Sequence, residues 1–359
     1  MGSRRVGGSA GRFAPWSGEA SVSYGRFTVP LSRCPVVPLR MIHLLFTGGT
    51  ISMHRDPVAG GNVPAHGGEA LVGFTKGLEQ ISPFRIENWA MLPACHLGPD
   101  RLWALRERVR EITQAGDARG IVVAHGTDTL EETAYLLDRT LDSQVPVAIT
   151  GAMRTSSDEG WDGPRNLLDS AAVCAAHDSA GRGVMVVFHG NVLAGRTAVK
   201  THTTDLDAFT APHNKPLGRV EDGRVVFIKR SGDGAAEQPA LLLPAELSAR
   251  IALVPMVIGD AGEMLDLARP THDGVVVIAF GSGNVPPGAV PALRRWKEEG
   301  KPVVLASRCP NGEVQPNYAF DGGGARLIAH GVIPAGPRTI SQARMELMIA
   351  VSAGAAYGS

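Results

Sequence analysis

Hydroxyl side chains follow the first clear apolar run of the chain at a spacing that suits contact with a ligand. The tetrapeptide at 47–50 reads Thr-Gly-Gly-Thr and is followed by Ile51 and Ser52. Its two glycines allow a tight turn that brings the backbone close to a ligand, while the threonines present hydroxyl groups. An ordinary glycine turn in which threonine serves as a cap explains the tetrapeptide equally well.

A second polar segment, 125–129, reads His-Gly-Thr-Asp-Thr and also follows an apolar run. Thr129 and Glu132 have the spacing of a capping box, which predicts that a helix begins here. That pattern leaves Thr127 and Asp128 unexplained. A hydroxyl and a carboxylate at a helix N-terminus could bind an oxyanion and a cationic group together, although Asp128 could simply be an alternative cap.

Two further segments carry polar residues after apolar runs. The segment 151–154 reads Gly-Ala-Met-Arg, and 162–167 contains Pro164 at a position that predicts the start of a helix. Lys200 lies in Val-Lys-Thr-His-Thr-Thr-Asp at 199–205. A single lysine is normally a solvated charge, so Lys200 gains importance only if the fold places it beside the threonines.

Several other kinds of chemistry are disfavoured. The loop at 281–284 superficially resembles a dinucleotide-binding loop, but Pro286 and Pro287 lie where the helix that holds the pyrophosphate should run. The sequence contains no P-loop motif and no zinc-protease motif. Neither the histidines nor the cysteines have the spacing of a metal or redox site, so no metal is expected.

The composition is that of a folded chain. It has 35 Lys and Arg against 35 Asp and Glu, whereas a nucleic-acid-binding protein usually carries a basic excess. Apolar residues make up 44% and charged residues 19%, which excludes wholesale disorder. No stretch approaches the roughly 18 consecutive apolar residues of a membrane span, and the cytoplasm is the expected location.

The polar segments are positioned by an alternation of short apolar runs and helical patterns. The runs are rich in β-branched residues and predict buried strands at 42–46, 121–124, 145–149, 184–188, 275–280 and 303–306. Helical patterns lie between them at 100–115, 129–142, 163–178, 288–299 and 341–353. The alternation predicts parallel α/β sheets with ligand sites at their carboxyl edges, and runs at 86–92 and 224–228 could be edge strands.

Two domains are expected, because 359 residues are too many for one hydrophobic core of ordinary size. A polar stretch with glycine and proline predicts a linker at 231–248, between a larger N-terminal domain at 41–230, with a mainly parallel sheet flanked by helices, and a smaller parallel-sheet α/β domain at 249–359. Met41 opens the first clear strand, so we expect 1–40 to be a disordered leader or a mis-called start, with an organelle transit peptide as the alternative.

Taken together, these motifs resemble those of the L-asparaginase/glutaminase amidohydrolase family. The matching segments, spread over 41–355, are TGGTIS at 47–52, HGTDTLEETA at 125–134, GAMR at 151–154, DGPRNL at 162–167, VKTHTTD at 199–205, FGSGN at 280–284 and SQAR at 341–344. The resemblance implies a two-domain α/β enzyme that hydrolyses L-asparagine to aspartate and ammonia, with weaker action on glutamine. It also implies a homodimer or homotetramer with sites between subunits, and no cofactor.

The resemblance assigns catalytic roles to four residues. Thr50 matches the family nucleophile, Thr127 a second catalytic threonine, and Lys200 its proton-relay partner. Asp128 matches the acid that binds the substrate's α-ammonium group. Such a site would form an ester on Thr50 that water then hydrolyses. The residue that first accepts the proton of the nucleophile stays open. Burial would favour the neutral form of Lys200, whereas the nearby Asp128 carboxylate would favour its charged form.

The resemblance also implies substrate contacts. The backbone carbonyl of Ala152 would meet the amide nitrogen, and Asn284 would be contributed by a neighbouring subunit. The family's carboxylate-binding serine is replaced by Ala94, which removes one hydrogen bond worth about 1.5–3 kcal/mol. Backbone amides around Ala94 and Cys95 could still hold the carboxylate. The segment 53–68 resembles the family's active-site lid but lacks the tyrosine that assists the nucleophile in well-studied bacterial members.

Two other functions stay open. An ammonia-generating subunit of a tRNA-dependent amidotransferase uses the same catalytic domain, but it needs a partner subunit and an additional folded N-terminal domain. An amino-acid-binding protein with decayed catalysis is favoured slightly by Ala94 and by the lid without tyrosine. Such a protein would have no use for Thr50, Thr127 and Lys200.

Overall fold

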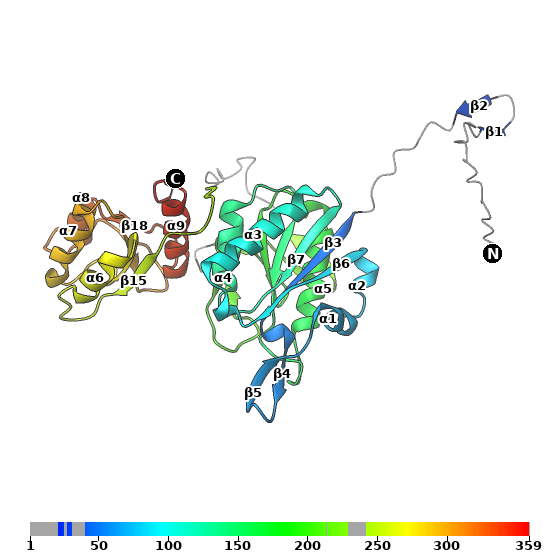
Figure 1. Cartoon of the computed structure of the whole chain (residues 1–359), viewed down its shortest axis with the longest axis horizontal. Coiled ribbons are helices and arrows are strands. Elements are labelled where there is room, and N and C mark those ends of the chain that lie inside the picture. The colour runs from blue at the N-terminus through cyan, green and yellow to red at the C-terminus, as the bar shows by residue number, and fades with distance from the viewer. Residues whose placement is uncertain (1–20, 25–26, 31–39, 213, 229–241, 359) are drawn as a thin grey trace, which may run out of the picture. The chain divides into compact units, whose positions relative to one another are not determined.

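The computed structural model describes residues 21–24, 27–30, 40–212, 214–228 and 242–358 (Figure 1). Met1–Leu39 and Arg40–Ser359 are two separate compact units. In the first unit, β1 (Ser21–Tyr24) pairs antiparallel with β2 (Phe27–Pro30). The other residues of the expected leader before Arg40, and residues 231–241 of the expected linker, lie outside the described residues.

The second unit alternates strands and helices. Its strands are β3 (Met41–Gly48), β4 (Met53–Asp56), β5 (Gly61–Pro64), β6 (Phe84–Leu92), β7 (Ala118–Ala124), β8 (Val147–Thr150), β9 (Val184–Phe188), β10 (Asn191–Ala194), β11 (Val199–Lys200), β12 (Phe209–Thr210), β13 (Gly218–Glu221), β14 (Arg224–Phe227), β15 (Ile251–Pro255), β16 (Gly274–Ala279), β17 (Val303–Ser307) and β18 (Ile333–Pro334). Its α-helices are α1 (Gly68–Phe74), α2 (Leu78–Ile81), α3 (Pro99–Gln114), α4 (Leu130–Thr140), α5 (Gly163–Ala175), α6 (Glu263–Ala268), α7 (Val290–Glu298), α8 (Gly324–Ala329) and α9 (Ile340–Ser352). Short 3-10 helices include η1 (Thr50–Ser52) and η2 (Ala94–His96).

The larger sheet has the strand order β14-β13-β10-β9-β8-β7-β3-β6. The strands from β9 to β6 are parallel, whereas β10, β13 and β14 continue the sheet antiparallel. The runs at 86–92 and 224–228 correspond to β6 and β14, and both lie at edges of this sheet. The mainly parallel arrangement confirms the predicted fold class.

The inner strands β8 and β9 are buried along their whole length, as are most residues of β3 and β7, because helices cover both faces of the larger sheet (Figure 1). Leu45, Val123 and Ile149 pack with α3 and α4 on one face. Their sequence neighbours, such as Leu44 and Val122, pack with α1, α2 and α5 on the other face. Successive side chains of a strand point to opposite faces, so continuous burial requires a helical layer on each side.

A second sheet, with the order β15-β16-β17-β18, is fully parallel and confirms the smaller α/β domain. One face packs on α6, α7 and α8, and the other packs on α9. Helix α9 also packs against α4 of the larger domain. In that contact, buried Glu346 accepts hydrogen bonds from the Tyr135 hydroxyl and the Arg139 guanidinium, at 2.9 Å each. The C-terminal helix is thereby held against α4, which begins at Leu130.

The predicted helices and strands are found within a few residues of their expected ends. In α5, Pro164 lies in the first turn, as predicted. Within the described part of the chain, no helix is both long enough and apolar enough to cross a membrane. The described residues also contain no group of three His, Cys, Asp or Glu side chains arranged to hold a metal ion.

Candidate active site

Four loops at the carboxyl edge of the larger sheet pack together through their backbones. A Cβ added to Gly49 would lie 2.2 Å from the Cα of Gly126, and one added to Gly126 would lie 2.7 Å from the Cβ of Ala94. A Cβ on Gly151 would lie 2.4 Å from the carbonyl oxygen of His125. Gly49 also has a φ of +82°, which side chains of L-residues rarely tolerate. These glycines therefore serve close approach between loops, beyond the needs of a simple turn.

The two threonines of the first loop have different surroundings. The buried Thr47 hydroxyl donates to the carbonyl oxygen of Ala124 at 3.1 Å and ties two strand ends together. Thr50 opens the 3-10 helix η1, and its hydroxyl makes no hydrogen bond to another described residue. Thr47 is consequently structural, while the Thr50 hydroxyl is available to a ligand.

The second loop and β11 bring an amine, a hydroxyl and a carboxylate together. The Nζ of Lys200 donates to the Thr127 hydroxyl oxygen at 2.9 Å and to Asp128 Oδ1 at 3.0 Å. Thr127 is buried, whereas the Asp128 side chain is 68% exposed. Asp128 and Lys200 line an open cavity of about 320 Å³ together with the segment 201–203. The fold thus places Lys200 beside one of the two candidate threonines, with the carboxylate facing the cavity.

His125 of the same motif is a structural residue. Its ring is completely buried, with Nδ1 2.8 Å from the carbonyl oxygen of Gly126 and Nε2 3.2 Å from the Thr133 hydroxyl. A carbonyl can only accept, so Nδ1 carries the proton and Nε2 accepts from the Thr133 hydroxyl. Burial lowers the pKa of His125 to about 4, and the ring is therefore neutral near pH 7.

The predicted capping box at Thr129 and Glu132 is wrong, although α4 does begin directly after Thr129. The Thr129 hydroxyl donates to the carbonyl oxygen of Ala94 at 3.2 Å instead of accepting from the helix. A capping box does form at the start of α9, between Thr339 and Gln342. The Thr129 backbone, with φ −124° and ψ 15°, does not have the extended conformation that is typical of a capping residue, and its hydroxyl contacts the loop of Ala94 instead.

Ala94 and Cys95 begin the short helix η2, beside the second loop. Ala94 is buried against Gly126, while the Cys95 thiol is exposed. Ala94 has no polar side chain, so any ligand group bound here would have to meet backbone amides.

Two residues that the sequence interpretation did not single out shape the loop of Ala152. The Asp162 carboxylate accepts hydrogen bonds from the backbone N–H groups of Met153 and Arg154, at 3.0 and 2.9 Å. Asn166 Nδ2 donates to the carbonyl oxygen of Gly151 at 3.0 Å. Ala152 is completely buried. The motif at 162–167 was the sequence signal for these two residues. Its role in holding the loop of Ala152 is seen only in the folded structure.

Comparison with known proteins agrees with this geometry. The family model "Asparaginase, N-terminal" matches residues 41–232, and "Glutaminase/Asparaginase C-terminal domain" matches residues 250–357. The chain belongs to the asparaginase family. It is therefore an amidohydrolase, as the motifs predicted.

Relatives cover most of this asparaginase-family chain. It is 36% identical over 321 residues to a probable L-asparaginase of Deinococcus radiodurans, covering 88% of this chain and 94% of that protein. It is 30% identical over 325 residues to a subunit of the glutamyl-tRNA(Gln) amidotransferase of Pyrococcus furiosus, covering 88% of this chain and 72% of that protein. A crystal structure of a probable cytoplasmic L-asparaginase from Campylobacter jejuni superposes with a TM-score of 0.75 at 27% identity, covering 87% and 95% of the two chains.

The expected lid of this family member contains an antiparallel hairpin, β4–β5, which projects from the larger domain in Figure 1. Polar contacts tie its base to the loop that follows Ala152. The Ser156 hydroxyl donates to the carbonyl oxygen of Met53 at 3.1 Å and lies 2.7 Å from His66 Nε2. Ser157 lies 2.8 Å from His54 Nδ1. Imidazole and hydroxyl groups therefore anchor the hairpin in this chain, which has no lid tyrosine.

Asn284 lies in the smaller domain, in the turn that follows β16. Its Oδ1 accepts a hydrogen bond from the backbone N–H of Gly324 at 3.3 Å, and its backbone pairs with Phe280. These contacts are local to the smaller domain, and no interaction of Asn284 with Thr50, Thr127 or Lys200 occurs within the described residues of this chain.

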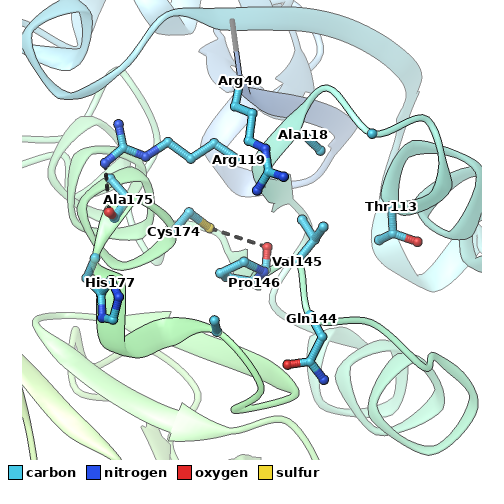
Figure 2. Close-up of a pocket in the computed structure, with 13 residues that line it drawn as sticks. Arg40, Thr113, Ala118, Arg119, Gln144, Val145, Pro146, Cys174, Ala175 and His177 are labelled. Carbon is cyan, nitrogen blue, oxygen red and sulfur yellow. Dashed lines mark hydrogen bonds between the residues drawn. The ribbon is translucent and has the colours of Figure 1, made fainter. Parts of the chain in front are cut away.

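A larger cavity lies at the opposite edge of the larger sheet. It has a volume of about 720 Å³ and adjoins the amino ends of β7 and β8. Figure 2 shows the Arg40 and Arg119 side chains extending over it, with the Arg119 guanidinium donating to the carbonyl oxygen of Ala175 at 2.9 Å. Cys174 is buried in its wall, and burial raises the pKa of this thiol to about 12. This cavity is therefore separate from the residues that could carry chemistry.

Proposed function

We propose that this protein hydrolyses L-asparagine to L-aspartate and ammonia through an ester on Thr50, with weaker action on L-glutamine. The observation that carries the proposal is the contact of 2.9 Å between Lys200 Nζ and the buried Thr127 hydroxyl. Thr127 lies in the loop packed, through Gly126 and Gly49, against the loop of Thr50. A weak hydroxyl nucleophile needs an adjacent group that removes its proton, and a lysine in contact with a buried threonine is suited to that task.

The reaction proceeds in two steps. The Thr50 oxygen attacks the side-chain carbonyl carbon while its proton passes toward Thr127 and Lys200. The carbon–nitrogen bond then breaks, and the leaving nitrogen takes a proton and departs as ammonia. Water attacks the resulting ester, releases aspartate and returns the proton to Thr50. No metal or other cofactor takes part in these steps.

Substrate binding would use the exposed Asp128 carboxylate together with backbone groups of the neighbouring loops. Asp128 binds the α-ammonium group. This group competes with Lys200 for the carboxylate and so loosens the Lys200–Asp128 ion pair. The carbonyl of Ala152 accepts from the substrate amide, and backbone amides at Ala94 and Cys95 meet the α-carboxylate. The loss of a serine hydroxyl at Ala94 predicts weaker binding of asparagine than a serine-bearing site would give.

The remaining expectations form part of the same proposal. The chain acts in the cytoplasm as a homodimer or homotetramer, with Asn284 supplied to the site by a second copy. Its domains extend over 41–230 and 249–359, joined by a linker at 231–248.

The test is ammonia release by the purified full chain from L-asparagine, D-asparagine and L-glutamine. We expect saturable release from L-asparagine and slower release from L-glutamine. A folded protein that releases no ammonia from any of the three would contradict the proposal. If calorimetry showed saturable binding of L-asparagine while no ammonia was released, the amino-acid-binding alternative would be supported instead.

A second candidate function is favoured by the 30% identity to the Pyrococcus furiosus amidotransferase subunit. In that role, ammonia would be passed to a partner that carries an aminoacyl-tRNA. The test compares ammonia release from free L-asparagine by the chain alone and with a partner that carries an aminoacyl-tRNA. Equal rates in the two cases would contradict this candidate.

A further inference from the structure

Lys200 lies on a short and weakly supported element. Strand β11 has only two residues, Val199 and Lys200, and it pairs with the equally short β12 in a two-stranded sheet. Two-stranded ribbons are marginally stable without further packing. The lysine therefore needs other contacts to keep its amine at hydrogen-bonding distance from Thr127.

One such contact comes from the start of α4. The Glu131 carboxylate accepts a hydrogen bond from the backbone N–H of Lys200 at 2.6 Å. Glu131 is the second residue of α4 and lies four residues after Thr127 in the chain. The helix start that presents the threonine therefore also holds the backbone of the lysine that touches it.

A second set of contacts comes from the smaller domain. The Ser341 side chain lies beside the Glu131 carboxylate, whose pKa it lowers, and both residues line one cavity. Gln342 Nε2 donates to the carbonyl oxygen of Ala198 at 3.4 Å. Ser341 and Gln342 belong to the first turn of α9, whose capping box at Thr339 fixes its backbone. The start of α9 thus contacts Glu131 and the chain just before Lys200.

The Glu131 carboxylate is partly removed from water and is hydrogen-bonded. Burial raises its pKa, while the hydrogen bond from Lys200, the Ser341 side chain and the charge of Lys200 lower it. The neighbouring Glu132 faces Arg344 of α9 at 3.9 Å and makes no hydrogen bond or ion pair with β11 among the described residues. The two adjacent glutamates therefore differ in what they contact.

We propose that Glu131 is a positioning residue for Lys200, and that Ser341 fixes Glu131 so that the C-terminal domain helps to order the lysine–threonine pair. This inference rests on the proposed function, because its catalytic consequence is a loss of amide hydrolysis.

The test compares four variants of the full chain in steady-state ammonia release. Glu131→Ala removes the acceptor and should lower kcat by about a hundredfold with little change in KM, as expected when a reacting group is displaced by about 1 Å. Glu131→Gln keeps an oxygen acceptor and should restore most of kcat. Ser341→Ala should have a smaller effect of the same kind. Glu132→Ala is the matched control and should leave kcat close to that of the unsubstituted protein.

Equal kcat in Glu131→Ala and Glu132→Ala, with both folded by circular dichroism, would overturn the inference. So would a Glu131→Gln variant as impaired as Glu131→Ala, because the backbone contact would then not be the cause.

A second measurement does not depend on turnover. Acetylation of Lys200 by acetic anhydride, followed by peptide mass spectrometry, should be faster in Glu131→Ala than in Glu132→Ala. If the unsubstituted protein releases no ammonia, the proposed function fails, and this labelling decides whether Glu131 positions the lysine. Unchanged labelling of Lys200 would overturn the inference.

Discussion

The two edges of the larger sheet differ in both volume and chemistry. At the amino edge, a cavity of about 720 Å³ lies between arginine side chains and a buried cysteine, as Figure 2 shows. At the carboxyl edge, a cavity of about 320 Å³ adjoins Asp128 and Lys200. The smaller cavity has the hydroxyl, amine and carboxylate groups in contact with one another.

Helix direction explains part of this difference. Helices α4 and α5 begin at the carboxyl edge, where their free N–H groups and positive dipole ends favour developing negative charge. Helices α3 and α5 end beside the amino-edge cavity and present carbonyl groups there. Glycine is also used differently, because Gly49 and Gly126 bring loops into contact, whereas Gly116 at the amino edge has open space around it. The candidate active site is therefore indicated by polar groups that lie close together, and the volume of a cavity alone does not indicate it.

The largest expected effect is the loss of the nucleophile. Thr50→Ala should lower kcat by about a thousandfold or more, because the ester can no longer form. Cys174→Ala, at the amino edge, should leave kcat unchanged, because burial raises the pKa of this thiol and keeps it unreactive. Ammonia release measures both. If Thr50→Ala retained its turnover, the conclusion that catalysis at the carboxyl edge depends on Thr50 would be wrong.

Backbone packing should give the next largest effect. Gly49 and Gly116 share a φ of +82°, so alanine at either position is strained by about 1–3 kcal/mol, and the ψ of −174° at Gly49 belongs to a region that is essentially confined to glycine. At Gly49 the added methyl group also collides with Gly126, which should add about 1–3 kcal/mol and separate the two catalytic loops. Urea unfolding and ammonia release should show Gly49→Ala to be less stable and nearly inactive. Equal behaviour of the two variants would show that the close approach has no function.

A smaller effect concerns pH and stability. His125 has an ordinary pKa of 6.5 when unfolded and about 4 when buried, so the unfolded chain binds the extra proton between these values. The free energy of unfolding therefore falls as pH decreases from about 6.5 to about 4. Between pH 7 and pH 5, His125→Asn should lose about 1–2 kcal/mol less stability than the unsubstituted protein.

The matched control for that prediction is His177→Asn, at the amino edge. The His177 side chain is fully exposed, so its replacement removes no buried ring. Urea unfolding at both pH values should give the unsubstituted pH dependence for this variant. If His125→Asn shows the same dependence, the buried ring is not a source of acid sensitivity.

Much of the fold could be predicted, because strands covered on both faces must be apolar along their whole length. Hence 121–124 and 303–306 could be recognised without a structure. The hairpin β4–β5 and the pairing of β10 with β13 could not, because such short strands depend on contacts made after folding. Thr129 shows the same limit, since its hydroxyl contacts a carbonyl of a distant loop in place of the cap that the local pattern predicts.

The sequence by itself determined which residue types stand after each strand, and it placed Thr50, Thr127 and Lys200 in recognisable motifs. It also supplied glycine where two loops touch. The tertiary structure alone decided that Lys200 contacts Thr127, 73 positions earlier, and that α9 reaches Glu131. The physical reason is that Thr127 follows a strand of the larger sheet, whereas Lys200 lies on the separate two-stranded sheet β11–β12 and Ser341 on α9, so these segments meet only in the folded chain. Local sequence patterns do not encode that distance.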